Sequence, residues 1–167
     1  MKLSVTGTVL LGFWRWPFTV RTTPPGLPSR TSTAFFSVKV RERPAWITGF
    51  EHRVDSPSLG ARDLTTAPSA AAAGQAAGAA GVDAAELHAP FTHQEILLRA
   101  ALGLGEGVRI NPSGGALCGN PMFAAGLARI GMAAREIFSG RAGRALGHAT
   151  SGPALQQNLV CVMEDKS

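Results

Sequence analysis

The chain has 167 residues, with 16 lysines and arginines against 11 acidic residues and a net charge of +5. This length suits one domain, or one domain with a long extension, and allows about two thirds of the surface to be buried without disulfide bonds. Cys118 and Cys161 are the two cysteines. They are too few for a secreted disulfide framework, so we expect a cytoplasmic protein. No apolar run reaches the roughly 18 residues that a membrane span needs, so none is expected.

The positive charge is concentrated near the N-terminus. Residues 1–41 contain six basic residues and no acidic one, whereas the rest of the chain carries 10 basic residues against all 11 acidic ones. A surface that binds nucleic acid needs clustered lysine and arginine, often with aromatic side chains for stacking. The nearly neutral body of the chain shows no such cluster, so we expect no nucleic-acid partner.

Residues 1–43 are interpreted as an irregular or disordered basic extension, and residues 44–167 as the folded domain. The extension includes the proline-rich Thr22–Ser29 and no apolar period longer than a few residues. Its basic, acid-free composition is typical of a mitochondrial transit peptide, and Val5–Trp14 after Lys2 resembles a signal peptide without a cleavage pattern. A disordered extension, or upstream sequence outside the original gene product, is the alternative.

The first elements of the domain are a strand and a helix. Pro44–Phe50 is rich in apolar and aromatic residues, which predicts a buried strand. Ala70–Ala80 predicts a helix of small residues with Pro68 in its first turn, and a low-complexity linker is the alternative. Three polar residues are candidates for its N-cap: Asp63, Thr65 and Thr66.

Two more helices follow a predicted short strand at Val82–His88. Thr92–Glu95 has the pattern of a capping box and predicts the start of a helix that ends before Gly103. Asn120 followed by Pro121 predicts the start of the next helix. Its expected buried stripe repeats at helical spacing: Phe123, Leu127, Ile130, Ala134 and Ile137.

Two strand-like runs, Arg144–Thr150 and Asn158–Glu164, surround a turn-rich segment and predict a hairpin. The order of strands and helices predicts an α/β fold with a mixed sheet of about four or five strands, covered by helices. Ligands of such sheets bind where strands end and helices begin. Here those ends carry His88–Thr92 and Gly114–Pro121, where a functional site is expected.

Three pieces of the sequence, in order, resemble the C-terminal half of the thiolase superfamily, in particular its lipid-transfer or sterol-carrier type. Asn111–Gly126 has the layout of the thiolase segment N-x-x-G-G-x-x-x-x-G-H-P-x-x-x-x-G. His88–Thr92 is similar to the N-E-A-F or H-D-x-F turn, and Ala145–Asn158 stands in the place of the terminal cysteine loop. The resemblance covers about residues 43–164. It implies a thiolase-like C-terminal domain that takes acyl-CoA as substrate and needs no cofactor.

The resemblance implies catalytic positions at His88, Asn120 and His148. Asn120 replaces the histidine of the G-H-P turn, and its neutral amide can donate to a thioester oxygen but cannot exchange a proton near pH 7. It also suits a simple helix cap. His88 and His148 can each act on the thioester or serve as hydrogen-bonded structural histidines, and these alternatives stay open.

Substrate-binding positions are implied at five residues: Gly114, Gly115, Gly119, Ser151 and Gly152. No metal site is expected, because the histidines near the site lack diagnostic zinc spacing and Glu95 is explained by the capping box.

The half that carries the acylated cysteine in thiolases is outside the match, and residues 1–43 contain no cysteine. We therefore expect a truncated thiolase-like protein of lipid metabolism, inactive alone, whose chemistry is acyl transfer or aldolase-type cleavage beside a CoA thioester. Expected partners are acyl-CoA, a second copy or a complementary thiolase half, and a zinc-ribbon and OB-fold subunit. The alternative is a non-catalytic assembly or partner-docking module with the same fold.

Overall fold

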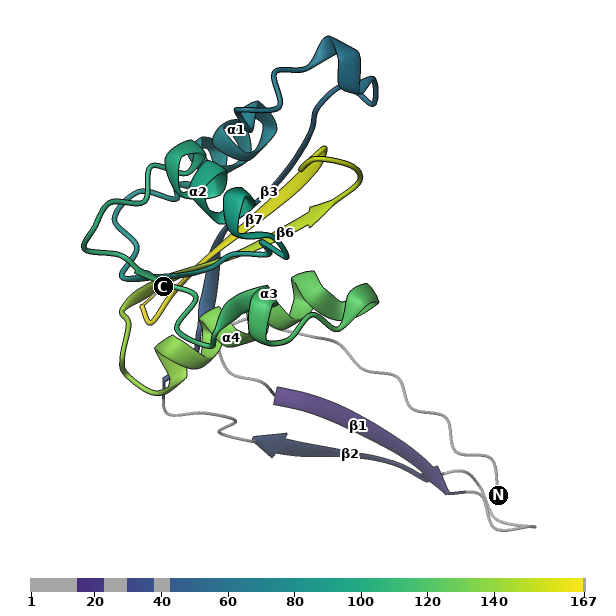
Figure 1. Cartoon of the computed structure of the whole chain (residues 1–167). Coiled ribbons are helices and arrows are strands. Elements are labelled where there is room, and N and C mark those ends of the chain that lie inside the picture. The colour runs from purple at the N-terminus through teal and green to yellow at the C-terminus, as the bar shows by residue number, and fades with distance from the viewer. Residues whose placement is uncertain (1–14, 23–29, 38–42, 167) are drawn as a thin grey trace. The chain divides into compact units, whose positions relative to one another are not determined.

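The computed structural model describes residues 15–22, 30–37 and 43–166 (Figure 1). The chain divides into two units, Met1–Glu42 and Arg43–Ser167. In the first unit, β1 (Arg15–Thr22) and β2 (Arg30–Ser37) form an antiparallel pair within the expected extension. The segment compared with a signal peptide, Val5–Trp14, lies outside the described residues.

The second unit contains a five-stranded mixed sheet, which confirms the predicted α/β class. Its strands are β3 (Trp46–Val54), β4 (Ala84–Glu86), β5 (Arg109–Ile110), β6 (Arg144–Ser151) and β7 (Gln157–Glu164). They lie in the order β3-β7-β6-β4-β5. β4 runs parallel to β5 and β6, whereas β7 runs antiparallel to β3 and β6. The β6–β7 pair is the predicted hairpin.

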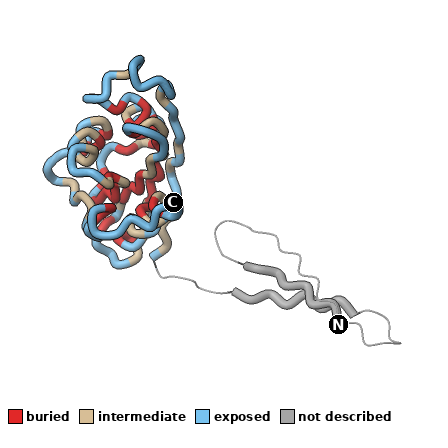
Figure 2. The backbone as a smooth tube through the Cα atoms, turned by 45° about the vertical axis from the view of Figure 1, so that its right-hand side comes forward, coloured by how far each residue is buried: buried red, intermediate tan, exposed pale blue. Residues whose placement is uncertain are grey.

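Helices cover both faces of this sheet (Figure 1). α1 (Pro68–Ala77) and α2 (Thr92–Ala101) pack on one face, and α4 (Ala125–Phe138) packs on the other. Short helical turns connect them: η1 (Leu59–Ala61), α3 (Gly115–Cys118) and η2 (Met122–Ala124). Figure 2 shows the buried residues gathered inside these layers. One buried cluster includes Leu87 and Leu98 under α1 and α2, and a smaller one includes Ile137 under α4.

The first predicted strand exists but is not buried. β3 lies at the edge of the sheet, where it pairs with β7, and most of its residues are exposed. Ile47 and Phe50 are 62% and 56% exposed. The apolar run predicted a strand correctly, but it could not show whether that strand lies in the middle or at the edge of the sheet.

Gly49 permits close packing of α1 on β3. A methyl group added at Gly49 would lie 2.0 Å from the carbonyl oxygen of Ala77, a backbone atom that cannot swing aside. We expect Gly49→Ala to lower the free energy of unfolding by about 2 kcal/mol, measured by urea denaturation. Gly105→Ala is the control, because a methyl there meets nothing within 4 Å. Equal losses in both variants would contradict this packing argument.

The predicted N-caps of α1 and α2 are wrong. α1 has Pro68 in its first turn, as predicted, but its N-cap is Ala67 without a side-chain hydrogen bond. The predicted cap Asp63 instead accepts hydrogen bonds from the backbone N–H and the hydroxyl of Thr65. α2 begins at Thr92, yet its N-cap is Phe91 and no capping bond forms. Asp63 does not cap α1 because its carboxylate bonds to the nearby Thr65 instead.

The predicted start of α4 is also wrong, and its predicted buried stripe is right only toward the C-terminal end, where Ile137 is buried and Ile130 and Ala134 pack against the same cluster. The helix begins at Ala125, so Asn120 does not cap it. Phe123 and Leu127 are 102% and 73% exposed. The face of α4 that packs on the sheet instead carries two charged residues among small and apolar ones: Ala125, Arg129, Ala133, Glu136 and Ile137. Apolar spacing alone selected the opposite face at the start of the helix, because buried charges were not anticipated there.

Candidate functional site

His88 and Asn120, which the sequence places 32 positions apart, come together beyond the carboxyl end of β4. The His88 Nδ1 atom lies 3.2 Å from the carbonyl oxygen and 3.4 Å from the backbone nitrogen of Thr150, in β6. The side chain of Asn120, from the loop between α3 and η2, lies close enough to His88 to raise the pKa of its ring. We call His88, Asn120 and Thr150 the His88 corner.

The imidazole at this corner is neutral near pH 7. Burial lowers the pKa of His88, the hydrogen bonds with Asn120 and Thr150 partly oppose that effect, and the charge of Arg129 lowers the pKa further. A neutral imidazole has one N–H, so Nε2 of His88 can donate to a ligand oxygen in the tautomer in which Nδ1 accepts from the backbone N–H of Thr150. Asn120 is exposed, so its amide is accessible to an incoming ligand. Together they can bind a polarised oxygen without bringing a formal charge.

The double glycine has a conformational role. Gly114 and Gly115 have φ angles of 90° and 64°, in the left-handed region that favours glycine. A methyl group on Gly114 would lie 2.7 Å from Cys118 Sγ, and one on Gly115 would lie 2.8 Å from Asn111 Cγ. These glycines therefore allow the tight turn into α3.

The other predicted binding residues lie beside the corner in sequence. Gly119 directly precedes Asn120 and ends α3, and Ser151 directly follows Thr150 at the end of β6. Gly152, next along the chain, has a φ angle of 74°. All three are exposed, although the carbonyl oxygen of Gly119 already accepts a hydrogen bond from Arg129.

His148 does not join the His88 corner. Its neighbours in β6, Gly147 and Ala149, meet α4, whereas His148 points to the other face of the sheet, toward α1. It is fully buried, and its Nε2 atom lies 2.9 Å from Asn158 Oδ1. Burial lowers the pKa of His148 to about 4. His148 therefore lies on the face of the sheet opposite α4 and makes no bond to the corner, although the charge of His88 is near enough to lower its pKa.

Sequence reasoning missed a buried charged cluster beneath the Asn111–Asn120 loop. Glu86, in β4, has a completely buried carboxylate. It accepts hydrogen bonds from the backbone N–H of Ser113 at 2.9 Å and from the Ser113 hydroxyl at 2.7 Å. Arg129 lies 3.2 Å from the same carboxylate. One signal in the sequence could have revealed this cluster: Glu86 stands within a short apolar strand, and a buried carboxylate needs a partner.

Asn111, which the sequence analysis treated only as the first residue of a motif, bonds both to the chain after β4 and to α2. Its Oδ1 atom accepts a hydrogen bond from the backbone N–H of Leu87 at 2.7 Å, and its Nδ2 atom donates to Glu95 Oε2 at 2.8 Å. Glu95, the residue assigned to a capping box, therefore serves to hold the start of this loop. The bond explains why the capping carboxylate is not available to the backbone of α2.

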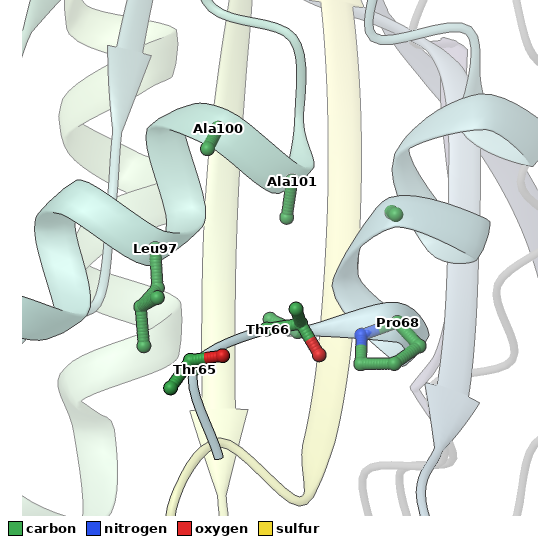
Figure 3. Close-up of a pocket in the computed structure, with 8 residues that line it drawn as sticks. Thr65, Thr66, Pro68, Leu97, Ala100 and Ala101 are labelled. Carbon is green, nitrogen blue, oxygen red and sulfur yellow. The ribbon is translucent and has the colours of Figure 1, made fainter. Parts of the chain in front are cut away.

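A cavity of about 270 Å³ lies elsewhere, between α1 and α2 (Figure 3). It is lined mainly by small and apolar side chains, including Thr65, Thr66, Pro68, Leu97, Ala100 and Ala101. None of the residues predicted for the functional site lines it. Among the residues that the structure describes, no three His, Cys, Asp or Glu side chains gather as metal ligands would. No helix within the same described ranges is long and apolar enough to cross a membrane.

No family model and no curated protein sequence matches the chain. The structure is similar to the crystal structure of human mitochondrial 3-ketoacyl-CoA thiolase, with a TM-score of 0.57 and 22% sequence identity. The similarity covers 78% of this chain and 31% of that thiolase, so the chain spans about a third of its length. Similarity at this level of identity concerns the fold. The mixed sheet and its two helical layers are therefore a thiolase-like α/β fold.

Proposed function

We propose that the second unit binds an acyl-CoA thioester at the His88 corner. The observation that carries the proposal is the meeting of His88 and Asn120 at the carboxyl end of β4 in a thiolase-like fold. Such strand ends are the usual ligand sites of α/β sheets. The similar solved structure is that of a 3-ketoacyl-CoA thiolase, which supports a CoA thioester as the ligand class.

The proposed chemistry is the making or breaking of a carbon–carbon bond next to the thioester. Negative charge develops on the thioester oxygen in such reactions, and one well-placed donor at Asn120 stabilises the transition state by about 3 kcal/mol. Because an amide exchanges no proton near pH 7, proton transfer falls to another group. Acyl transfer then needs a cysteine nucleophile from a complementary half or another subunit, whereas an aldolase-type cleavage needs no nucleophile but still needs a base to take the hydroxyl proton and an acid to protonate the enolate.

The three motif pieces, Asn111–Gly126, His88–Thr92 and Ala145–Asn158, support placing the chain with lipid-transfer or sterol-carrier-type thiolase-like proteins of lipid metabolism. On this proposal its partners are a second copy or a complementary thiolase half, together with a small zinc-ribbon and OB-fold subunit. Serine and glycine at Ser151–Gly152 contribute backbone donors beside the corner.

Calorimetric titration with a thioether analogue of acyl-CoA tests the proposal. Saturable binding is expected, and His88→Ala or Asn120→Ala should each weaken it about tenfold, the effect of one lost hydrogen bond. His52→Ala, on the exposed side of β3, is the control and should bind like the wild type. A chain that retains no analogue, alone or with a supplied N-terminal thiolase half, would rule the proposal out.

A second candidate function is a docking module without chemistry of its own. The observation that favours it is a set of exposed apolar side chains beside the corner: Leu117 at 56%, Met122 at 78%, Phe123 at 102% and Leu127 at 73% exposure. Exposed apolar side chains that lie within a few residues of one another in sequence favour an interaction site. Light scattering on the titrated sample separates the two candidates, because a stable oligomer that retains no analogue favours docking.

A further inference from the structure

One buried arginine contacts both ends of the loop that carries Asn120. The NH1 atom of Arg129 donates to Glu86 Oε2 and to Ser113 Oγ, each at 3.2 Å. Its NH2 atom donates to the carbonyl oxygen of Gly119 at 3.3 Å. Ser113 stands at the start of the turn into α3, and Gly119 stands at its end. The Arg129 side chain is only 5% exposed; its bond to Glu86 is buried, and its bonds to Ser113 and Gly119 are partly buried.

We propose that Arg129 is a positioning residue, whose guanidinium holds the Gly119 carbonyl and thereby fixes Asn120 against His88. The proposal rests on the proposed function for the meaning of the His88 corner, but the contact between Arg129 and Gly119 stands without it. Gly119 and Asn120 are adjacent, so the anchor acts one peptide away from the amide that reaches His88.

The geometry requires an arginine rather than any cation. The planar guanidinium presents separate N–H donors in a rigid fork, so one arm reaches Glu86 and Ser113 while the other reaches Gly119. A lysine ammonium is a single point at the end of its chain and cannot span both. Glu86 completes the arrangement, because its carboxylate neutralises the buried charge and holds Ser113 independently through the backbone N–H.

Titration of His88 reports directly on the placement of Asn120. The groups that act on His88 are Asn120, Thr150 and Arg129, and His148 lies close enough for the two imidazoles to interact. Asn120 raises the pKa of His88 and so favours the protonated ring, whereas the charge of Arg129 lowers it. Arg129→Lys keeps the charge and removes the second arm, so it isolates the positional effect.

A double-substitution cycle on the full chain, followed by NMR titration of the His88 ring, tests the proposal. Asn120→Ala should lower the pKa of His88 in the wild-type background and cause no further shift in Arg129→Lys. The matched control is Arg141→Lys, because Arg141 also pairs with a glutamate of α4, Glu136, but at the far end of the helix. In that background Asn120→Ala should act as in the wild type.

An equal shift from Asn120→Ala in the wild type and in Arg129→Lys would overturn the proposal. If Arg129→Lys does not fold, the same comparison is made in Glu86→Gln/Arg129→Met, which removes both charges and leaves none buried alone. The outcome is independent of the proposed function, because the titration needs no ligand. A wild type that binds no acyl-CoA analogue but shows the cycle would reject acyl-CoA binding and keep Arg129 as the positioning residue.

Discussion

Arg129→Met is expected to lower the free energy of unfolding by about 3–5 kcal/mol, because it leaves the Glu86 carboxylate buried without its countercharge. The side chains of Arg129 and Glu86 are 5% and 1% exposed, and their charged atoms lie 3.2 Å apart. The bonds from Ser113 to Glu86 remain but carry no positive charge. Guanidinium denaturation of the wild type and the variant at pH 7 gives the difference.

The control is Glu86→Gln/Arg129→Met, in which both charges are removed together. A buried ion pair can often be replaced by neutral groups at little cost, so this double variant should recover most of the lost stability. Equal losses in the single and double variants would show that an uncompensated Glu86 charge is not the cause. A loss below about 1 kcal/mol in Arg129→Met would show that the pair is not buried in solution, since exposed pairs contribute that little.

The large features of the fold followed from local patterns, whereas the packing of α4 did not. Pro68 marked the first turn of α1, and the two apolar runs around Ser151–Gln157 marked the hairpin, because these signals depend only on nearby residues. The buried face of α4 depends on Glu86, 43 positions before Arg129. An apolar pattern cannot show that a distant carboxylate will draw an arginine into the interior, so it placed Phe123 and Leu127 there instead.

The candidate site, like the fold, was predictable only where it depends on local sequence patterns. The rule that sites gather at strand ends indicated His88–Thr92 and Gly114–Pro121, and the catalytic roles of His88 and Asn120 stay predictions. The opposite orientation of His148 was readable in part from alternation along β6: Gly147 and Ala149 share one face, and their small size fits the close approach of α4. The position of Asn120 decides which face of the sheet carries the candidate site. The loop that carries Asn120 is held by Arg129 and Glu86, which are far from it in sequence, so no local pattern reveals its position.

His148 is held as a neutral imidazole by a chain of buried hydrogen bonds. Asn158 Nδ2 donates to Ser69 Oγ and to the carbonyl oxygen of Leu155, each at 2.7 Å. Both amide hydrogens are therefore used, and Asn158 Oδ1 must accept from His148 Nε2, which carries the hydrogen. Ser69 in turn donates to Asp55 at 2.6 Å. His148 Nδ1 is left unprotonated, buried and without a hydrogen-bond partner in the described part of the chain.

Acid should destabilise the protein through His148. Its pKa is about 4 in the folded protein, against 6.5 for an ordinary histidine. Between these values the unfolded chain binds a proton that the folded protein does not, so the stability is complete above pH 6.5 and is lost as the pH falls toward 4. The total loss is about 3 kcal/mol, of which about 2 kcal/mol falls between pH 7 and pH 5.

Urea denaturation at pH 7, 6 and 5 measures this loss, and His148→Gln removes it. Glutamine keeps an N–H donor for Asn158 Oδ1 but does not titrate, so the variant should lose about 2 kcal/mol less than the wild type over this range. The pKa of Glu136 is about 2, below its ordinary 4.5, so its contribution disappears only at lower pH and does not enter the comparison. His52→Gln, at an exposed histidine, should keep the wild-type slope. If the free energy of unfolding falls equally with pH in the wild type and in His148→Gln, the folded protein protonates His148 as readily as the unfolded chain does. That result would contradict the prediction.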